Sequence, residues 1–422
     1  MILFSPIWRF KEGVIRMKIA MMTNNYKPFV AGVPISIERL TDSLRNQGHQ
    51  VVVFAPSYDG QEPEDGVVRY SSLLKGIAGG ASVPNSLDPE IERQFREGGF
   101  DVIHVHHPML IGHTARYLSQ KYRVPLVFTY HTRYEQYLHY VGLSGLKGLM
   151  PTYVRNCTRY CELIIAPTPL IKDYLEEIQQ EVPVQVLPTG VPEDSFNPDE
   201  IQAAKIRQTL LEDKKYLFCT VARLAKEKNL EFLLDSLKRR KDAGYSDFKL
   251  ALIGDGPERQ KLEKYAADLD LQNEIVFIGK VPNKEIKNYC KAADLFLFSS
   301  CSETQGIVLL EAMAAGTPVL ALRATGTEDV VVNGQNGYMT EVSENRNEMI
   351  QRFTNQLIDI LEKKELNFLR LGALATAQSY SCERIANQAV GVYATAIRNR
   401  MQREELRLRG RNKRPGMVYF QW

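Results

Sequence analysis

The chain has 422 residues, of which 44% are hydrophobic and 24% charged, and its formal net charge is +3. This balance is typical of globular proteins and excludes an intrinsically disordered chain. At about 150 residues per domain, the length predicts two or three domains.

Neither the cysteines nor the apolar runs indicate a secreted or membrane-spanning protein. The six cysteines include no C-x-x-C pair, which predicts reduced thiols in a cytoplasmic protein. No run approaches the roughly 20 apolar residues of a transmembrane helix. Residues 1–16 lack the basic start and the cleavage site of a signal peptide, so we expect an N-terminal extension that need not be ordered, with Met17 as the alternative start.

The positive charge is concentrated near the C-terminal end. Residues 398–414 hold eight Lys or Arg and two Glu, so the rest of the chain is slightly acidic. One interpretation is a solvated tail. The other is attraction to an anionic membrane surface, where each basic side chain contributes about 1 kcal/mol. Nucleic acid is disfavoured as a partner because no aromatic stripe or nucleic-acid module accompanies the charge.

Two series of β-branched, apolar runs alternate with helical patterns. This alternation predicts an α/β protein with two Rossmann-like, doubly wound parallel sheets. A Pro-, Gly- and Asp-rich stretch between the two series predicts a linker, and an apolar helical stripe follows the second series. The expected strands are residues 18–23, 50–56, 101–107, 125–131, 163–168 and 184–190 in the first series and 216–222, 249–256, 275–279, 295–300 and 318–322 in the second.

These patterns set the domain limits. After the extension at 1–16, we expect an N-terminal domain at 17–198, a C-terminal domain at 199–380, and a helix with a basic tail at 381–422. Ligands bind such sheets beyond the carboxyl ends of the strands. The expected site therefore lies in a cleft between the two domains.

Glycines follow several of the expected strands. Gly32 comes between the first strand and its helix, and Gly254 opens the sequence GDGPE after a strand of the second domain. A missing side chain lets backbone amides and a helix N-terminus approach an anion. For Gly32, a plain turn glycine is the alternative.

Two cations stand where the first strand of the second domain gives way to a helix. Arg223 follows the apolar strand directly, and Lys228 comes five residues later. A guanidinium near a core needs an anionic partner, and the two cations together are suited to hold a diphosphate and to stabilise charge on a departing phosphate. Ordinary surface charge is the alternative for Lys228.

The stretch SETQGIVLLEAMAAGTPVLA begins at residue 302 and places two carboxylates eight residues apart. Glu303 precedes the expected helix, whereas Glu311 lies more than one turn inside it, since a helix has about 3.6 residues per turn. In the alternative interpretation, Glu303 only faces the helix dipole and Glu311 is a helix surface residue.

The backbone amides between these carboxylates complete the pattern. Those of Gln305, Gly306 and Ile307 open the helix and are expected to point at a phosphate. A nucleotide-sugar is hydroxylated at both ends and anionic in the middle. This stretch therefore predicts a nucleotide-sugar donor as ligand.

The E-x7-E spacing of Glu303 and Glu311 occurs together with four other motifs. ARLAKEKN and GDGP precede it in the chain, and AAGTPVLA and NGQNGY follow it. This set resembles the retaining glycosyltransferase family 4 of the GT-B fold, over about residues 17–395. The resemblance implies a metal-independent hexosyltransferase with an acceptor-side N-terminal domain and a C-terminal domain that binds the nucleotide-sugar.

The resemblance also implies roles for individual residues. Glu311 would hold the donor ribose, and Glu303 would contact the sugar hydroxyls and the sugar end of the diphosphate. Arg223 and Lys228 would bind the diphosphate. The first loop of the family is usually Gly-Gly, and here the residue before Gly32 is an alanine.

Within the family, TYHTRYEQYLHYVG at 129–142, together with SETQG, looks most like bacterial diacylglycerol glucosyltransferases, which make membrane glycolipids. This comparison makes His131 the active-site histidine near the transferred sugar. An imidazole there is suited to donate or accept a hydrogen bond at neutral pH. The alternative is a histidine satisfied within the core.

Metal binding is disfavoured, and no cofactor is expected. The histidines at 104, 106, 107 and 113 share no spacing with a carboxylate or a cysteine. Asp268-Leu269-Asp270 resembles a metal-binding D-x-D sequence, but it comes at a helix end rather than after a strand. The stretches 71–80 and 142–160 mix apolar and basic residues, which predicts interfacial helices or core-facing segments with a basic edge.

We therefore expect a cytoplasmic enzyme, peripheral to the inner face of the cell membrane, that transfers glucose from UDP-glucose to a lipid hydroxyl such as that of diacylglycerol. The rivals are a GDP-mannose-dependent or soluble-acceptor transferase and, from another class, a nucleotide-sugar 2-epimerase. A binding-only relative is disfavoured because the whole set of site residues is present. The sequence leaves the base, the number of sugars added and the oligomeric state open.

Overall fold

The computed structural model describes residues 10–11, 14–29, 31–77, 81–131, 148–301 and 303–412. Contacts divide the chain into two compact units: unit 1 comprises Met1–Leu187 and Ile385–Trp422, and unit 2 comprises Pro188–Arg384. The chain therefore passes from one unit to the other twice. The units are groups of contacting residues, so the expected limits at 17–198, 199–380 and 381–422 stay a prediction.

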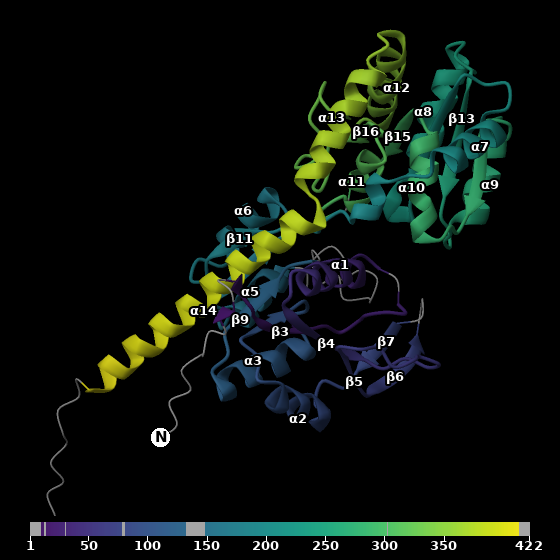
Figure 1. Cartoon of the computed structure of the whole chain (residues 1–422). Helices are drawn as coiled ribbons and strands as arrows, with labels where there is room; N and C mark the ends of the chain where they lie inside the picture. Colours follow the sequence, from purple (N-terminus) through teal and green to yellow (C-terminus); the bar gives the residue numbers. More distant parts are fainter. Residues whose placement is uncertain are drawn as a thin grey trace, which may run out of the picture. The chain divides into compact units, whose positions relative to one another are not determined.

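Unit 1 contains a seven-stranded sheet in the order β11-β10-β9-β8-β3-β4-β5, and all neighbouring strands are parallel (Figure 1). Three of its central strands are buried along their whole length, because helices cover both faces of the sheet. The strands are β3 (Lys18–Met22), β4 (Gln50–Pro56), β5 (Val67–Tyr70), β8 (Val102–Val105), β9 (Leu126–Thr129), β10 (Leu163–Ala166) and β11 (Val184–Val186).

Helices pack on the two faces of this sheet with separate apolar cores. One core contains buried residues of α2, α3, α5 and α6, and the other contains those of α1 and α14. Several starts carry a cap: Asp88 accepts a hydrogen bond from the amide of Glu90 at the start of α2, and Thr168 caps α6. The helices are α1 (Gly32–Asn46), α2 (Pro89–Gly98), α3 (Ile111–Tyr122), α5 (Met150–Thr158), α6 (Pro169–Ile178) and α14 (Cys382–Asn412).

Two short antiparallel pairs accompany the main sheet of unit 1: β1 (Phe10–Lys11) with β2 (Val14–Ile15), and β6 (Ser72–Ile77) with β7 (Ala81–Pro84). The second pair shows that the interfacial helix expected at 71–80 is wrong. Leu73 and Leu74 are exposed on β6, which explains why this stretch looked amphipathic. Of the stretch 142–160, residues 142–147 lie outside the described residues, and α5 buries Met150 and Val154.

The long helix α14 is anchored in unit 1 by its apolar stripe and by a buried carboxylate. Tyr393 and its apolar neighbours belong to the core beneath α1. The carboxylate of the fully buried Glu162 pairs with Arg400 at 3.2 Å and with Arg403 at 3.0 Å. It also accepts a hydrogen bond from the backbone amide of Leu126 at 2.7 Å. Two arginines of the basic segment therefore pair with a buried carboxylate of the fold.

Unit 2 contains a six-stranded, all-parallel sheet in the order β14-β13-β12-β15-β16-β17 (Figure 1). Its core strands are again buried on both faces. The strands are β12 (Tyr216–Val221), β13 (Phe248–Ile253), β14 (Ile275–Gly279), β15 (Leu295–Phe298), β16 (Val319–Leu322) and β17 (Gly337–Thr340).

One face of this sheet is covered by α7, α10, α11 and α13, and the other by α8, α9 and α12. Two parallel α/β sheets followed by a C-terminal helix confirm the predicted fold class. The helices are α7 (Glu200–Leu211), α8 (Leu230–Asp242), α9 (Arg259–Asp268), α10 (Asn283–Ala292), α11 (Ile307–Ala314), α12 (Arg346–Glu362) and α13 (Leu366–Ser379), with short 3-10 turns η4 (Glu193–Phe196) and η5 (Lys226–Lys228). No helix in the described parts of the chain combines the length and apolar character needed to cross a bilayer.

Candidate active site

The residues predicted to bind the diphosphate lie in the loop after β12. Arg223 is exposed, and Lys228 is half-buried at the end of η5. The neighbouring strand β15 is parallel to β12, so both strands end at the same edge of the sheet. The side chain of Ser299, just after β15, donates a hydrogen bond to the carbonyl of Lys228 at 2.8 Å. The two loops are therefore joined.

Lys228 and Glu303, which the sequence assigned to the same ligand, pair with each other in the structure. The ammonium of Lys228 donates to Oε1 of Glu303, and both side chains are about a quarter exposed. The hydroxyl of Ser300 donates to the same oxygen at 3.2 Å. This pair brings one positive and one negative group to the carboxyl edge of the sheet, where a ligand that is both anionic and hydroxylated finds a partner for each part.

Gly254 lets the loops after β12 and β13 touch backbone to backbone. Its φ is +131°, and a Cβ built there would lie 1.9 Å from the carbonyl oxygen of Ala222. Gly256 makes the same kind of approach, since its Cβ would lie 2.4 Å from the carbonyl oxygen of Leu224. Gly254 therefore has a packing role, whatever it contributes to a ligand.

The segment from Glu303 to the start of α11 is held by a second glycine loop. Gly306 caps the helix with a φ of +21°, and its missing side chain makes room for the carbonyl of Gly326. A Cβ on Gly326 would lie 2.9 Å from the Cβ of Glu303 and 3.1 Å from the amide nitrogen of Gln305. The sequence reasoning missed Gly326, although a glycine four residues after the strand β16 resembles the pattern that singled out Gly32.

Gln305 uses its side chain rather than only its backbone. Its amide oxygen accepts from the N–H of Thr189 at 2.7 Å, and its NH₂ donates to the carbonyl of Thr189 at 3.0 Å. Ile307 begins α11, and Glu311 lies one turn later, half-buried. The backbone amides of the first helical turn have no partner within the helix, which gives this end a positive partial charge.

His131 lies in unit 1, two residues after β9, and it is half-buried. Its Nε2 lies 2.8 Å from Nδ1 of His106, and the two rings stack with centroids 5.1 Å apart. Burial, with smaller contributions from the neighbouring His107 and His104, lowers the pKa of His131 to about 3. The ring is therefore neutral at pH 7.

Gly32 opens α1, also in unit 1. It is exposed, and a Cβ at this position would meet no atom within 4 Å. The N-terminus of α1 has no acidic residue in its first turn and no side-chain cap. The space around Gly32 and the uncapped amides are compatible with an anion.

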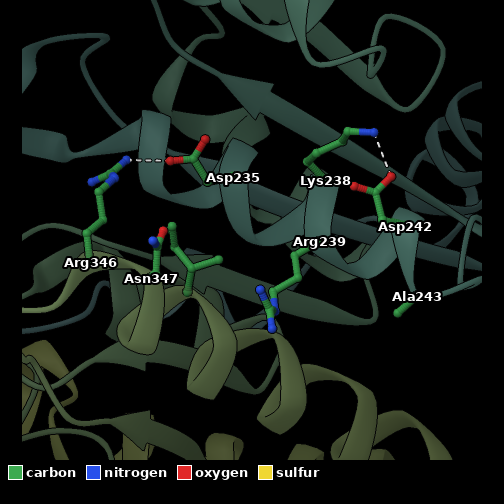
Figure 2. A pocket seen from close by; sticks show the side chains of 8 residues that line it. Asp235, Lys238, Arg239, Asp242, Ala243, Arg346 and Asn347 are labelled. Carbon is green, nitrogen blue, oxygen red and sulfur yellow. Dashed lines mark hydrogen bonds and ion pairs between the residues drawn. The ribbon is translucent and has the colours of Figure 1, made fainter.

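Neither clusters of possible metal ligands nor surface depressions indicate another site in the described residues. Within the described ranges, no group of three or more His, Cys, Asp or Glu side chains could hold a metal ion. A surface depression of about 550 Å³ on unit 2 is lined by residues of α8 and α12 and by Ala243, which follows α8 (Figure 2). Its charges are largely used by the ion pairs of Arg346 with Asp235 and of Lys238 with Asp242.

Two models of protein families match the chain, one in the first α/β sheet region and one in the second. The family model described as glycosyl transferases group 1 matches residues 202–367, and the model described as glycosyltransferase family 4 matches residues 30–195. Together these matches cover most of both α/β sheets.

Two curated relatives differ in the sugar that their names specify. The alpha-monoglucosyldiacylglycerol synthase of Streptococcus pneumoniae R6 is 30% identical over 328 residues, which cover 72% of this chain and 71% of that protein. The GDP-mannose-dependent alpha-mannosyltransferase of Corynebacterium glutamicum is 26% identical over 337 residues, which cover 78% of each.

A solved structure supports the architecture. The crystal structure of Anabaena Alr3699/HepE in complex with UDP matches with a TM-score of 0.71 at 20% identity, over 90% of this chain and 100% of that one. The GT-B fold implied by the sequence motifs is confirmed.

Proposed function

The chain belongs to glycosyltransferase family 4 and is a retaining glycosyltransferase, and from this premise we propose that it transfers glucose from UDP-glucose to the hydroxyl of a membrane diacylglycerol. The finer part of the proposal, glucose and diacylglycerol, is supported by the 30% identity to the pneumococcal synthase and by the sequence around His131. It also includes a location at the inner face of the cell membrane.

The observation that carries the donor side is the contact between Lys228 and Glu303 at the carboxyl edge of the unit 2 sheet. A UDP-sugar would replace this contact with two: its diphosphate takes the ammonium, and its sugar hydroxyls take the carboxylate. Arg223 is exposed five residues before Lys228 and would add a second cation. The donor-binding set that we propose is Gly32, Arg223, Lys228, Gly254, Gln305, Gly306, Ile307 and Glu311, with His131 and Glu303 at the reacting sugar.

In the reaction that we propose, the bond between the anomeric carbon and the β-phosphate oxygen breaks, and the acceptor oxygen bonds to the same face of the sugar. The acceptor hydroxyl gives its proton to the departing phosphate oxygen, so UDP and the glycolipid are the products. Lys228, Arg223 and the amides at the start of α11 stabilise the charge that grows on the leaving diphosphate. No side chain serves as a covalent nucleophile.

Exposed groups of unit 1 support a membrane acceptor. Leu73 and Leu74 are 65% and 59% exposed on β6, and Lys75, which pairs with the exposed Asp59 at 3.0 Å, follows them. A short apolar pair beside a cation suits the interface of an anionic bilayer. Beyond the arginines that Glu162 holds, Arg407 and Arg409 of α14 are exposed; Arg409 pairs with Glu405 at 2.6 Å, and Arg407 adds positive charge.

The decisive experiment is a turnover assay that crosses four donors with three acceptor conditions. UDP-glucose, UDP-galactose, UDP-N-acetylglucosamine and GDP-mannose are each offered with diacylglycerol in anionic vesicles, with diacylglycerol in neutral vesicles, and without lipid. We expect release of UDP from UDP-glucose alone, dependent on diacylglycerol and faster on anionic vesicles, with an α-linked product by NMR.

Each departure from this result has a defined meaning. Transfer from GDP-mannose would replace the donor by the one named for the Corynebacterium relative. Turnover that ignores lipid would remove the acceptor assignment and favour a soluble acceptor or epimerisation. Equal rates on neutral and anionic vesicles would show that Arg407 and Arg409 do not attract the protein to anionic lipid. The proposed transfer of glucose to diacylglycerol would still stand. The variant Leu73→Ser, Leu74→Ser tests the role of β6, and Leu87→Ser, at an even more exposed leucine outside β6, is its control.

A further inference from the structure

Four histidines gather where β8 and β9 end, and the proposed reaction uses only one of them. His104 is in β8, His106 and His107 follow it, and His131 follows β9. His106 is 1% exposed and lies between the other rings: its centroid is 4.2 Å from that of His104 and 5.1 Å from that of His131. A polar ring this deeply buried needs a hydrogen-bond partner for each nitrogen.

The partners of His106 fix which of its nitrogens carries the proton. Nε2 lies 3.4 Å from the sulfur of Met21, and Nδ1 lies 2.8 Å from Nε2 of His131. A thioether has no proton and can only accept a hydrogen bond. Nε2 of His106 must therefore be the protonated nitrogen that donates to sulfur, and in the neutral ring Nδ1 is then the acceptor.

This assignment determines the proton on His131. If Nδ1 of His106 accepts, Nε2 of His131 must donate, and the neutral ring of His131 keeps an unprotonated Nδ1. Both rings are neutral at pH 7, because burial lowers the pKa of His106 well below its usual value and that of His131 to about 3. The two rings therefore cannot exchange roles by simply binding a second proton.

We propose that His106 is a positioning residue, which holds His131 in the Nε2-protonated tautomer, so that Nδ1 of His131 can only accept a hydrogen bond. The importance of this for catalysis rests on the proposed role of His131, whereas the tautomer itself does not. The sequence alone does not decide whether His131 donates or accepts a hydrogen bond. The contact with His106 selects the second option.

The direct test is the protonation state of each histidine nitrogen. In protein labelled with ¹⁵N at both ring nitrogens, long-range ¹H–¹⁵N spectra separate a protonated nitrogen from a bare one. The chain has seven histidines, so each signal can be assigned by a single substitution. At pH 7 we expect His131 to be protonated at Nε2 and bare at Nδ1. An Nδ1-protonated ring or an imidazolium at His131 would overturn the proposal.

Three variants separate positioning from mere packing. His106→Phe removes the acceptor, and we expect His131 to lose its single tautomer. His106→Asn places an amide oxygen where Nδ1 was and should restore it. Met21→Leu removes the sulfur and keeps a similar volume, so His106 is no longer forced to accept, and we expect a mixture of tautomers at His131. The last variant keeps both histidines and decides the matter if His106→Phe does not fold.

The control is His49→Asn, a buried histidine elsewhere in unit 1, whose Nδ1 accepts from the amide of Met17 at 3.2 Å. An amide oxygen can take over that bond. We expect the His131 signals to stay as in the unmodified protein. If His49→Asn changes the tautomer as much as His106→Phe does, the effect is structural and the proposal fails.

Kinetics distinguish this inference from the proposed function. With UDP-glucose and diacylglycerol vesicles, we expect His106→Phe to lower kcat by about 10- to 100-fold, as for residues that orient metal-bound histidines, with little change in KM for the donor. His106→Asn should recover most of this loss. If the tautomer of His131 changes and kcat does not, the tautomer has no part in catalysis, and His106 is not a positioning residue. If His131→Ala itself is fully active, the proposed role of His131 fails, whereas the tautomer finding stands.

Discussion

Gln305 and Thr189 are 116 residues apart in the chain and share two hydrogen bonds, one in each direction, between the side-chain amide and the backbone. Gln305 is 4% exposed and lies between Glu303 and the start of α11, and Thr189 follows the first passage of the chain between the two units. The backbone beside Thr189 is itself paired, since Val191 bridges Ser381 near the second passage. Gln305 therefore ties the candidate donor loop to the connecting segment.

We predict that Gln305→Met destabilises unit 2 and weakens donor binding. The variant has a similar shape but removes the hydrogen bonds of Gln305 to the N–H and the C=O of Thr189, at about 1 to 3 kcal/mol for each. Urea unfolding measures the loss, and hydrogen exchange at the amide of Thr189 should accelerate. Gln305→Glu keeps the acceptor for this amide and should protect it more than Met does. Equal exchange rates in all three proteins would contradict the assignment.

We predict that Lys228→Ala lowers kcat/KM for the donor by about 10²- to 10³-fold, the usual effect of removing one group that stabilises a leaving anion. Stability should change by less than about 1 kcal/mol, because the pair with Glu303 is partly solvated. Steady-state kinetics with UDP-glucose and a urea titration measure the two quantities. Lys226→Ala, an exposed lysine in the same 3-10 turn, is the control. Similar kinetics in both variants would remove Lys228 from the donor site.

We predict opposite effects for alanine at the two candidate glycines. Gly254→Ala forces a Cβ to 1.9 Å from the carbonyl of Ala222 at a φ of +131°, so the protein should be strongly destabilised or should fail to fold. Gly32→Ala meets open space at a helix start, so stability should be unchanged or rise by up to about 1 kcal/mol. Thermal unfolding compares them. A loss of activity in Gly32→Ala without a loss of stability would support a ligand at α1.

The sequence predicts the sheets well because central parallel strands are apolar on both faces. It fails at the edges: the residues of β17 (Gly337–Thr340) stand out only as part of a family motif, and those of β6 predict an interfacial helix or a core-facing segment with a basic edge instead of a strand. An edge strand or a hairpin shows one exposed face, and its pattern is short and mixed. The pairing partner, which decides the structure, is far away in the sequence.

The candidate site was predicted as a set of residue types and not as a set of contacts. Glu303 and Lys228 were assigned to a ligand, but their contact depends on β12 and β15 being neighbours, which the sequence does not specify. The partner of Gln305 and the position of Gly326 beside Glu303 depend on segments that only the fold brings together. His106 was considered only as a metal ligand, because its contact with Met21 has no local signal.

The buried histidines also predict how stability depends on pH. Burial lowers the pKa of His104 and His131 to about 3 and that of His107 to about 4, whereas a histidine in the unfolded chain titrates near 6.5. Between these values the unfolded chain binds more protons than the folded one. The free energy of unfolding must therefore fall as the pH drops below 6.5, by up to about 1.4 kcal/mol per pH unit for each such histidine.

A pair of variants isolates this contribution from that of the carboxylates. His104→Asn removes one buried imidazole, so the slope of unfolding free energy against pH between about 6 and 4.5 should become shallower by about 1.4 kcal/mol per unit. Tyr393→Phe removes the hydroxyl that shares a 2.8 Å hydrogen bond with His104, but it leaves every histidine in place. It should lower stability at all pH values and keep the original slope. If the curves of His104→Asn and the unmodified protein run parallel through this range, His104 is not held neutral by burial.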